Sequence, residues 1–278
     1  MRFFLTAASL SLGLVGTLPA QEAPDYWFDR LDKRADSSLE VGLNMAIRSK
    51  SQSMDADGRL QILDPQHFRL NLTFRAALPE GHESGQKELE VHLLTVADGE
   101  TIWIESRNAA IEMHRVMYLP LASMNEVEAG IFYMGYGPHD ELHPLKAIAS
   151  LRQLGDFQVQ SSGVNQVRLI GRLNEDGVAR CGLPGPDFPK LDQVTIELDS
   201  KTGLPQAFLL RHDQGTAVHT RFKDFSFPEK FPKELFQYEV PEGLEPVDMS
   251  FFLGKRNKAE SKEEPEKAEK ESAEDQGT

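Results

Sequence analysis

The sequence predicts a mainly β fold of the α+β class, a half-open antiparallel β-barrel with helices covering its concave face. Strand-like alternation of apolar and polar residues fills most of the chain, with turn residues between the strands. Helical spacing is confined to the start and the middle. A sheet of about ten strands without repeated helical crossovers must curl into a barrel or split into a sandwich. We expect a barrel, because the central helices can cover one face, and no fixed period suggests a propeller or a solenoid.

The first half reads as a short helix followed by an antiparallel meander. Apolar residues at 27, 28 and 31 suit one face of a helix over residues 26–33. Alternation then predicts a strand over 39–48, and residues 55–58 (Asp-Ala-Asp-Gly) predict a turn into a strand over 60–63. The clearest strand is 68–75, with four apolar residues on one face and polar residues on the other. Further predicted segments are a loop over 76–88, strands over 90–96 and 101–105, a turn over 97–99 and a strand over 110–116.

The second half predicts short helices and then more strands. Met124, Val127 and Ile131 have helical spacing, and apolar residues recur every three positions after Pro144 until Gly155. Residues 199–205 form a turn in which Gly203 suits a positive φ. Strands are expected over 164–173, 193–198, 206–211, 217–227 and 236–240, with a loop over 180–190.

Both ends of the chain differ from the middle. Residues 1–20 have one positive charge, a short apolar stretch and a small residue at the end, which predicts a signal peptide cleaved after Ala20. Residues 254–278 are charged and contain no residue larger than Ala that could enter a core, so they predict a disordered tail, or alternatively a transient charged helix interrupted by Pro265. Residues 21–253 are therefore the expected domain, exported to a periplasm, and no later stretch is apolar and long enough to span a membrane.

Charge and cysteine content exclude several classes of function. The chain has 278 residues and a net charge of -14, which disfavours nucleic acid as a partner because duplex binding depends on Lys and Arg. The negative charge belongs to the domain, where it favours solubility and a basic partner surface. The single Cys181 cannot form an intramolecular disulfide, and we expect it in a loop.

No motif predicts catalysis, a metal or another cofactor. His139 and His143 lie four apart, but the Glu is in the wrong position for a zinc motif and prolines at 138 and 144 bracket the segment, so a solvated turn is expected. The strand histidines 92, 114 and 219 are expected to have structural roles. Phosphate-binding glycine loops and a Gly-x-Ser-x-Gly motif are absent, and the sequon at Asn71 lies inside a strand.

Several segments, in order, resemble the periplasmic outer-membrane lipoprotein carrier family with the LolA-like and LolB-like fold. The first is the helix that contains Leu31-Asp32-Lys33, followed by the strand 60–70 with Pro65 and Phe68. Next come the turn at Asp98-Gly99 with a strand carrying Trp103, and the turn at Thr202-Gly203. The final match is the segment 236–248 with its Pro-x-Gly at 241–243, and together the matches extend over about residues 27–248.

The resemblance implies a non-enzymatic carrier that holds lipid or lipoprotein acyl chains in an apolar barrel concavity, with delivery to the outer membrane as the role of the family. It also implies a membrane-associated donor or acceptor protein as a partner, and we expect a monomer. Burial of acyl groups stabilises such a complex by about 0.8 kcal/mol per methylene. The candidate lining residues, for which closed core packing is the alternative, are Leu70, Leu72, Phe74, Trp103, Leu145, Ile148, Leu151, Val194, Ile196, Leu198 and Phe208.

Two features depart from the carrier pattern. Asp64 stands just before the strand-ending Pro65, where carriers often have a basic residue associated with transfer. The central insertion around Phe132, Tyr133 and Tyr136, the loop over 180–190 and the charged tail also exceed the compact pattern, which suggests a different cargo. The alternatives are a LolA-like sensor or protein-interaction domain without lipid transfer and, less favoured, an exported hydrolase.

Overall fold

A computed structural model describes residues 23–48, 53–77, 88–122, 136–138, 141–161, 165–181, 191–212 and 215–250. Its first element is the predicted N-terminal helix, α1 (Pro24–Asp32), which begins with Pro at its first turn. The prolyl ring suits this position because the missing N–H would have no partner there. Trp27, Phe28 and Leu31 form the buried face of α1, as their spacing predicts. The expected signal peptide and the charged tail lie outside the described residues.

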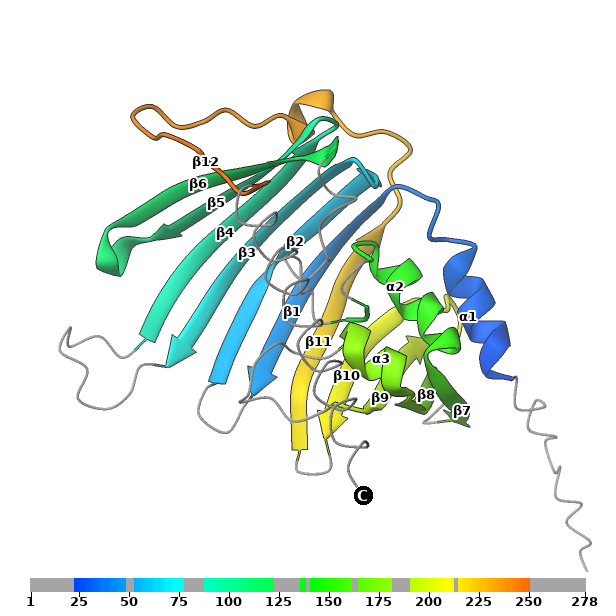
Figure 1. The fold of residues 1–278 in the computed structure, drawn as a ribbon. Helices are drawn as coiled ribbons and strands as arrows, with labels where there is room; N and C mark the ends of the chain where they lie inside the picture. Colours follow the sequence, from blue (N-terminus) through cyan, green and yellow to red (C-terminus); the bar gives the residue numbers. More distant parts are fainter. Residues whose placement is uncertain are drawn as a thin grey trace, which may run out of the picture.

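The described strands form one 12-stranded sheet with the order β12-β6-β5-β4-β3-β2-β1-β11-β10-β9-β8-β7 (Figure 1). Neighbouring strands are antiparallel except for β12, which pairs in parallel with β6. The strands are β1 (Leu39–Arg48), β2 (Ser53–Asp64), β3 (His67–Ala77), β4 (Glu88–Asp98), β5 (Thr101–Asn108), β6 (Met113–Pro120), β7 (Gly155–Ser161), β8 (Gln166–Leu173), β9 (Gln193–Asp199), β10 (Pro205–His212), β11 (Gly215–Ser226) and β12 (Val247–Asp248).

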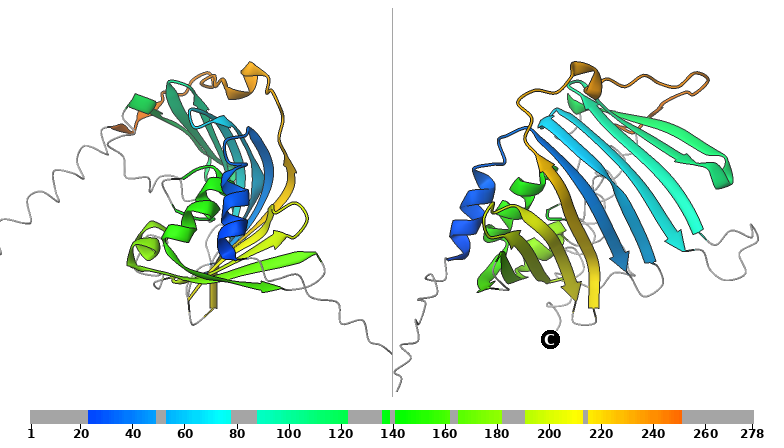
Figure 2. Two further views of the ribbon diagram at one scale, coloured as in Figure 1. Left: turned by 90° about the vertical axis from the view of Figure 1, so that its right-hand side faces the viewer. Right: turned by 180° about the vertical axis from the view of Figure 1, so that it is seen from behind.

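The sheet is strongly curled but open, because β12 and β7 lie at opposite ends of the strand order. Helices α1 and α2 (Pro144–Ser150) lie within the curve, next to the β7 to β11 side (Figures 1 and 2). A one-turn 3-10 helix, η3 (Leu151–Gln153), extends α2. The predicted architecture, a half-open sheet with helices over its concave face, is therefore confirmed.

The predicted turn over 55–58 is wrong, because β2 runs without interruption from Ser53 to Asp64. Ala56 and Gly58 face the concave side while Asp55 and Asp57 face the convex side, so the Asp-Ala-Asp-Gly segment obeys strand alternation. Gly58 is needed for a close approach of β2 to β3, since a Cβ atom there would lie 1.9 Å from the carbonyl oxygen of Asn71. The glycine thus marks a contact between strands rather than a turn.

Three other predictions require correction, and two elements had not been predicted. The segment 110–116 starts with the 3-10 helix η1 (Ala109–Ile111) before β6 begins at Met113, because Asn108 caps this turn. The segment expected as the last strand, 236–240, contains only the end of the 3-10 helix η4 (Lys233–Phe236), and β12 is the last strand. Strand β7 and helix α3 (Glu175–Cys181) were not predicted. Cys181 is therefore the buried last residue of a helix rather than a loop residue.

One hydrophobic core joins the concave face of the sheet to the helices. It includes the buried residues of α1, those of α2, and inward-facing residues of β1, β2, β3, β5, β8, β9, β10 and β11. Tyr136 lies fully buried between α2 and β11, with its ring 5.7 Å from Phe222 and its hydroxyl donating to the carbonyl oxygen of Leu142 at 2.6 Å. The helical segment therefore belongs to the core of the domain.

The segment 227–246, which we call the strap, crosses the convex face between β11 and β12 (Figure 2). Arg69 donates to the carbonyl oxygen of Leu235 at 3.2 Å, and the ring of Tyr238 stacks on Trp103 at 5.4 Å. The hydroxyl of Tyr238 donates to Glu105 at 3.1 Å. The strap thus positions β12 beside β6 by contacts on the outside of the sheet.

Within the described ranges, no helix is long and apolar enough to cross a membrane.

Candidate functional site: the concave face of the sheet

The pairing registers assign every strand residue to one face of the sheet. Residues directly opposite one another on neighbouring strands share a face, and successive residues alternate between faces. One such row links Leu70 on β3, Thr95 on β4 and Ile104 on β5, and another links Ile196 on β9, Phe208 on β10 and Thr220 on β11. Their apolar members belong to the main core, so these rows define the concave face.

Nearly all of the predicted lining residues lie on this face or on the helix that covers it. The buried members come from β3, β9, β10, α2 and η3, and they belong to one core cluster: Leu70, Leu72, Leu145, Ile148, Leu151, Val194, Ile196, Leu198 and Phe208. Phe74 is half-buried at the far end of β3, where it packs against this cluster and against a small second one formed by Met45, Ile47 and Ala56. The structure therefore brings these side chains together around α2.

Trp103 lies on the opposite face. Its neighbours Ile102 and Ile104 point into the core, so strand alternation turns Trp103 to the convex side. There its indole N–H donates to Asp98 at 2.9 Å, and its ring lies under Tyr238 of the strap. Trp103 therefore does not line the concavity, and the aromatic side chain holds the strap instead.

The concave face has two zones. Over β9 to β11 the helices α1 and α2 fill the curve and the facing side chains are buried, while Phe157, Val159 and Val167 on β7 and β8 stay half-buried against the same core. Over β3 to β6, beyond these helices, several apolar side chains on the concave face remain half-buried: Phe74, Val91, Leu93 and Met117. The half-buried zone over β3 to β6 leaves apolar surface for a ligand on the described concave face, beyond the helices.

Arg115 on β6 also lies on the concave face, and sequence reasoning missed it. It pairs with Ser106 of β5, which pairs with Leu93 of β4, which pairs with Leu72 of β3. The strand containing Arg115 was predicted, but its face could not be assigned because residues 109–111 form a helical turn instead of continuing the alternation. The register with β5, available only from the fold, is the signal that identifies this side chain.

His143 is buried, which corrects the expectation of a solvated turn for this part of the 139–143 pentad. The residue is 7% exposed at the start of α2, and neither ring nitrogen has a hydrogen-bond partner among the described residues. Burial lowers the pKa of His143 from 6.5 to about 4, and the nearby Lys146 ammonium acts in the same direction. The backbone of Ser37 and the carboxylate of Asp36 oppose this effect, but they are outweighed. His139 itself lies outside the described residues.

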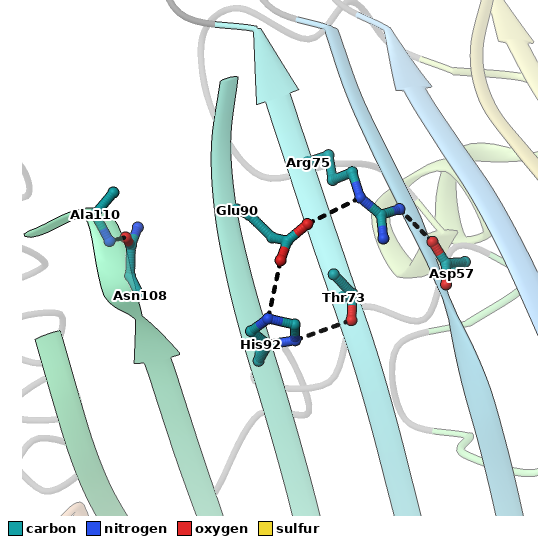
Figure 3. Close-up of polar contacts among 7 residues, drawn as sticks. All are labelled: Asp57, Thr73, Arg75, Glu90, His92, Asn108 and Ala110. Carbon is teal, nitrogen blue, oxygen red and sulfur yellow. Dashed lines mark hydrogen bonds and ion pairs between the residues drawn. The ribbon is translucent and has the colours of Figure 1, made fainter. Parts of the chain in front are cut away.

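The convex face is polar and its charges largely pair with one another (Figure 3). Arg75 lies between Asp57 and Glu90, and His92 contacts Glu90 at 3.0 Å and Thr73 at 3.1 Å. A polar groove of about 400 Å³ opens beside this network over β1, β2, β3 and β11. Because its charged walls are hydrophilic, this groove does not suit an acyl chain.

A buried carboxylate anchors the strap on the same convex side. Glu105 is 3% exposed and contacts His114 at 2.6 Å, Arg107 at 2.5 Å and the Tyr238 hydroxyl at 3.1 Å. Burial alone would raise the pKa of Glu105, but the hydrogen bonds from these groups outweigh it and lower that pKa. Burial, together with the charged carboxylate of Glu105, raises the pKa of Tyr238. This cluster is structural, in line with the expectation for His114.

In the part of the chain that the structure describes, no group of three or more His, Cys, Asp or Glu residues could hold a metal ion.

No model of a known protein family matches the chain, and no curated protein matches it. Solved structures similar to it include LprF from Mycobacterium bovis, 10% identical with a TM-score of 0.44 over 75% of this chain and 95% of LprF. A conserved uncharacterized protein from Thermus thermophilus is 11% identical with a TM-score of 0.38 over 80% and 97%. A LolA superfamily protein from Nitrosomonas europaea is 7% identical with a TM-score of 0.30 over 78% and 98%. The open, curled sheet with helices in its concavity is itself the architecture that the LolA-like resemblance implies.

Proposed function

We propose that this protein is an exported, non-enzymatic carrier that binds lipid or lipoprotein acyl chains on the concave face of its open sheet. The observation that supports it is the half-buried apolar zone over β3 to β6, next to a core that the helices close. An acyl chain placed there removes further apolar surface from water, at about 25 cal/mol for each Å². On the convex face of β2 to β4, by contrast, the described charges of Asp57, Arg75 and Glu90 pair with one another.

The proposal includes the export route and the partners expected from the sequence. The leader is cleaved after Ala20, residues 21–253 form the folded domain in the periplasm, and the charged tail remains outside it. A membrane-associated protein donates or accepts the cargo. N-terminal sequencing of protein recovered from a periplasm tests the cleavage site, and an intact leader would contradict it.

A second candidate function, a protein-interaction domain without lipid transfer, is favoured by the packing of the helical segment. Leu145, Ile148 and Leu151 are fully buried against the strands, so this part of the concavity is filled by the chain itself. The remaining apolar zone would then be a surface for a partner protein. The two functions differ in whether the purified protein contains lipid or takes it up.

The deciding experiment is native mass spectrometry of the full chain purified from a periplasm, followed by lipid extraction and uptake of a fluorescent fatty acid methyl ester. Leu93→Gln, on the concave face of β4, should weaken uptake roughly tenfold, because it replaces apolar contact with a polar group. The matched control is Leu94→Gln, one residue along on the convex face, which should leave uptake unchanged. Protein without lipid that also fails to take up the ester would refute the carrier and favour the interaction domain.

A further inference from the structure

Arg115 stands out by its charge on an otherwise uncharged surface. Among the ladder-paired strand residues that the structure describes, it is the one Asp, Glu, Lys or Arg side chain on the concave face. The other charged strand residues, such as Arg75 and Glu105, alternate onto the convex face. A cation at one point of an apolar surface is costly unless it is solvated or paired.

The surroundings of Arg115 leave its guanidinium available. The side chain is exposed, and it makes no hydrogen bond or ion pair with a described residue. Directly across the strand pair lies Ser106, whose hydroxyl can donate a hydrogen bond. The neighbouring buried carboxylate, Glu105, points to the other face and is already bound by His114, Arg107 and Tyr238.

A second observation at the same end of β5 is the side chain of Asn108. It is 1% exposed, and its Oδ1 accepts the backbone N–H of Ala110 at 2.9 Å (Figure 3). Its Nδ2 has no hydrogen-bond partner among the described residues. Asn108 shares a face with Ser106, two residues earlier on the strand, so an unsatisfied donor lies beside the free cation.

An apolar strip continues from this polar end towards the core. Met117, which follows Arg115 on the same face of β6, is half-buried, and so are Leu93 and Val91 on the same face of β4. Leu119, Ile104 and Ile102, farther along β6 and β5, are already buried in the core. The concave surface thus has one positively charged end and one apolar body.

We propose that the preferred cargo is an anionic amphiphile, whose carboxylate or phosphate head binds Arg115 and Ser106 while its apolar chain lies along β4, β5 and β6. A guanidinium suits such a head because its fork of donors matches two oxygen atoms of a carboxylate or phosphate. This inference rests on the proposed carrier function and specifies the chemical class of its ligand. A neutral lipid would leave Arg115 without a counter-charge.

The test compares a fluorescent fatty acid with its methyl ester, using the full chain. Arg115→Met keeps most of the aliphatic stem and removes the charge. It should weaken the binding of the fatty acid about tenfold, or about 1.4 kcal/mol, and change the binding of the ester less than twofold. The control is Arg221→Met, an exposed arginine on the convex face of β11, which should change neither. Excess acetate should not displace the bound fatty acid, because the apolar chain supplies much of the affinity.

The outcomes separate the two proposals. If Arg115→Met leaves the binding of the fatty acid intact, or weakens the binding of the acid and of the ester equally, Arg115 does not bind the head group. The carrier function would still stand. If acetate alone displaces the fatty acid, Arg115 is a simple anion site, and the proposal of an amphiphilic ligand is wrong. If the natural protein binds neither probe, the carrier function and the inference fail together.

Discussion

The buried His143 makes a specific prediction about acid stability. In the unfolded chain this imidazole takes up a proton below about pH 6.5, whereas in the folded protein burial lowers its pKa to about 4. Between these values the unfolded state binds more protons, so the free energy of unfolding decreases as the pH falls. The neutral ring of His143 contributes fully to the free energy of unfolding above about pH 6.5, and this contribution is lost by about pH 4. The free energy of unfolding therefore falls by about 3 kcal/mol between these pH values through His143.

The assay is urea denaturation at pH 7 and at pH 4 for the natural protein and for His143→Gln. Carboxylates also titrate in this range, so the informative quantity is the difference between the two proteins. The variant should lose about 3 kcal/mol less than the natural protein on acidification. His92→Gln, at an exposed position on the convex face, is the control and should follow the natural protein. Equal losses for all three proteins would refute the argument that His143 is folded as a buried neutral ring.

Three further predictions concern stability and are measured by the same denaturation assay at pH 7. Gly58→Ala should lower the free energy of unfolding by about 2 to 3 kcal/mol, because the new Cβ atom would collide with the carbonyl oxygen of Asn71. The control Gly42→Ala should lower it far less, because no atom lies nearer than 3.4 Å to the new Cβ atom. Equal losses for the two variants would contradict the close approach of β2 to β3. Tyr238→Phe should cost about 1.5 kcal/mol by removing a hydrogen bond to a buried carboxylate, and no loss relative to the exposed Tyr26→Phe would show that the strap is not held there. Ile148→Ala should cost about 3 kcal/mol by leaving a cavity under α2; a cost below about 1 kcal/mol, roughly that of a surface change, would mean that α2 is not packed into the core.

Much of the fold could be predicted because its signals are local. The alternation over 68–75 reports a strand with one wet face, and the spacing of Leu145, Ile148 and Leu151 reports a helix with one buried face. Since a period of two also identifies the core-facing side, most of the lining residues were placed on the concave face. The turn over 55–58 was misread because Asp and Gly are turn residues, while the pairing of β2 with both neighbours overrode that preference.

The rest of the site depends on contacts between distant segments. The outward direction of Trp103 follows from its alternation with Ile102 and Ile104, but the stacking of Tyr238 on its ring could not be predicted, because the strap is irregular and has no period. The face of Arg115 depends on a helical turn at 109–111, and one misplaced residue at the start of a strand reverses every side chain. Strand β12 is two residues long, too short to show any alternation.

The central position of β1 has a consequence for how the chain folds. Strands β1 to β6 and β7 to β11 are two meanders of sequence neighbours, and they are joined in the sheet by the pairing of β1 with β11, in which Glu40 lies opposite Ser226. Each meander can form early because its strands pair with their neighbours in sequence, but the joining step must close a loop that contains most of the chain. A polypeptide that crosses a membrane with its N-terminus first cannot complete this sheet until β11 has crossed. We therefore expect late closure of the sheet, which leaves the edge of β1 unpaired and open to misassembly until β11 joins it.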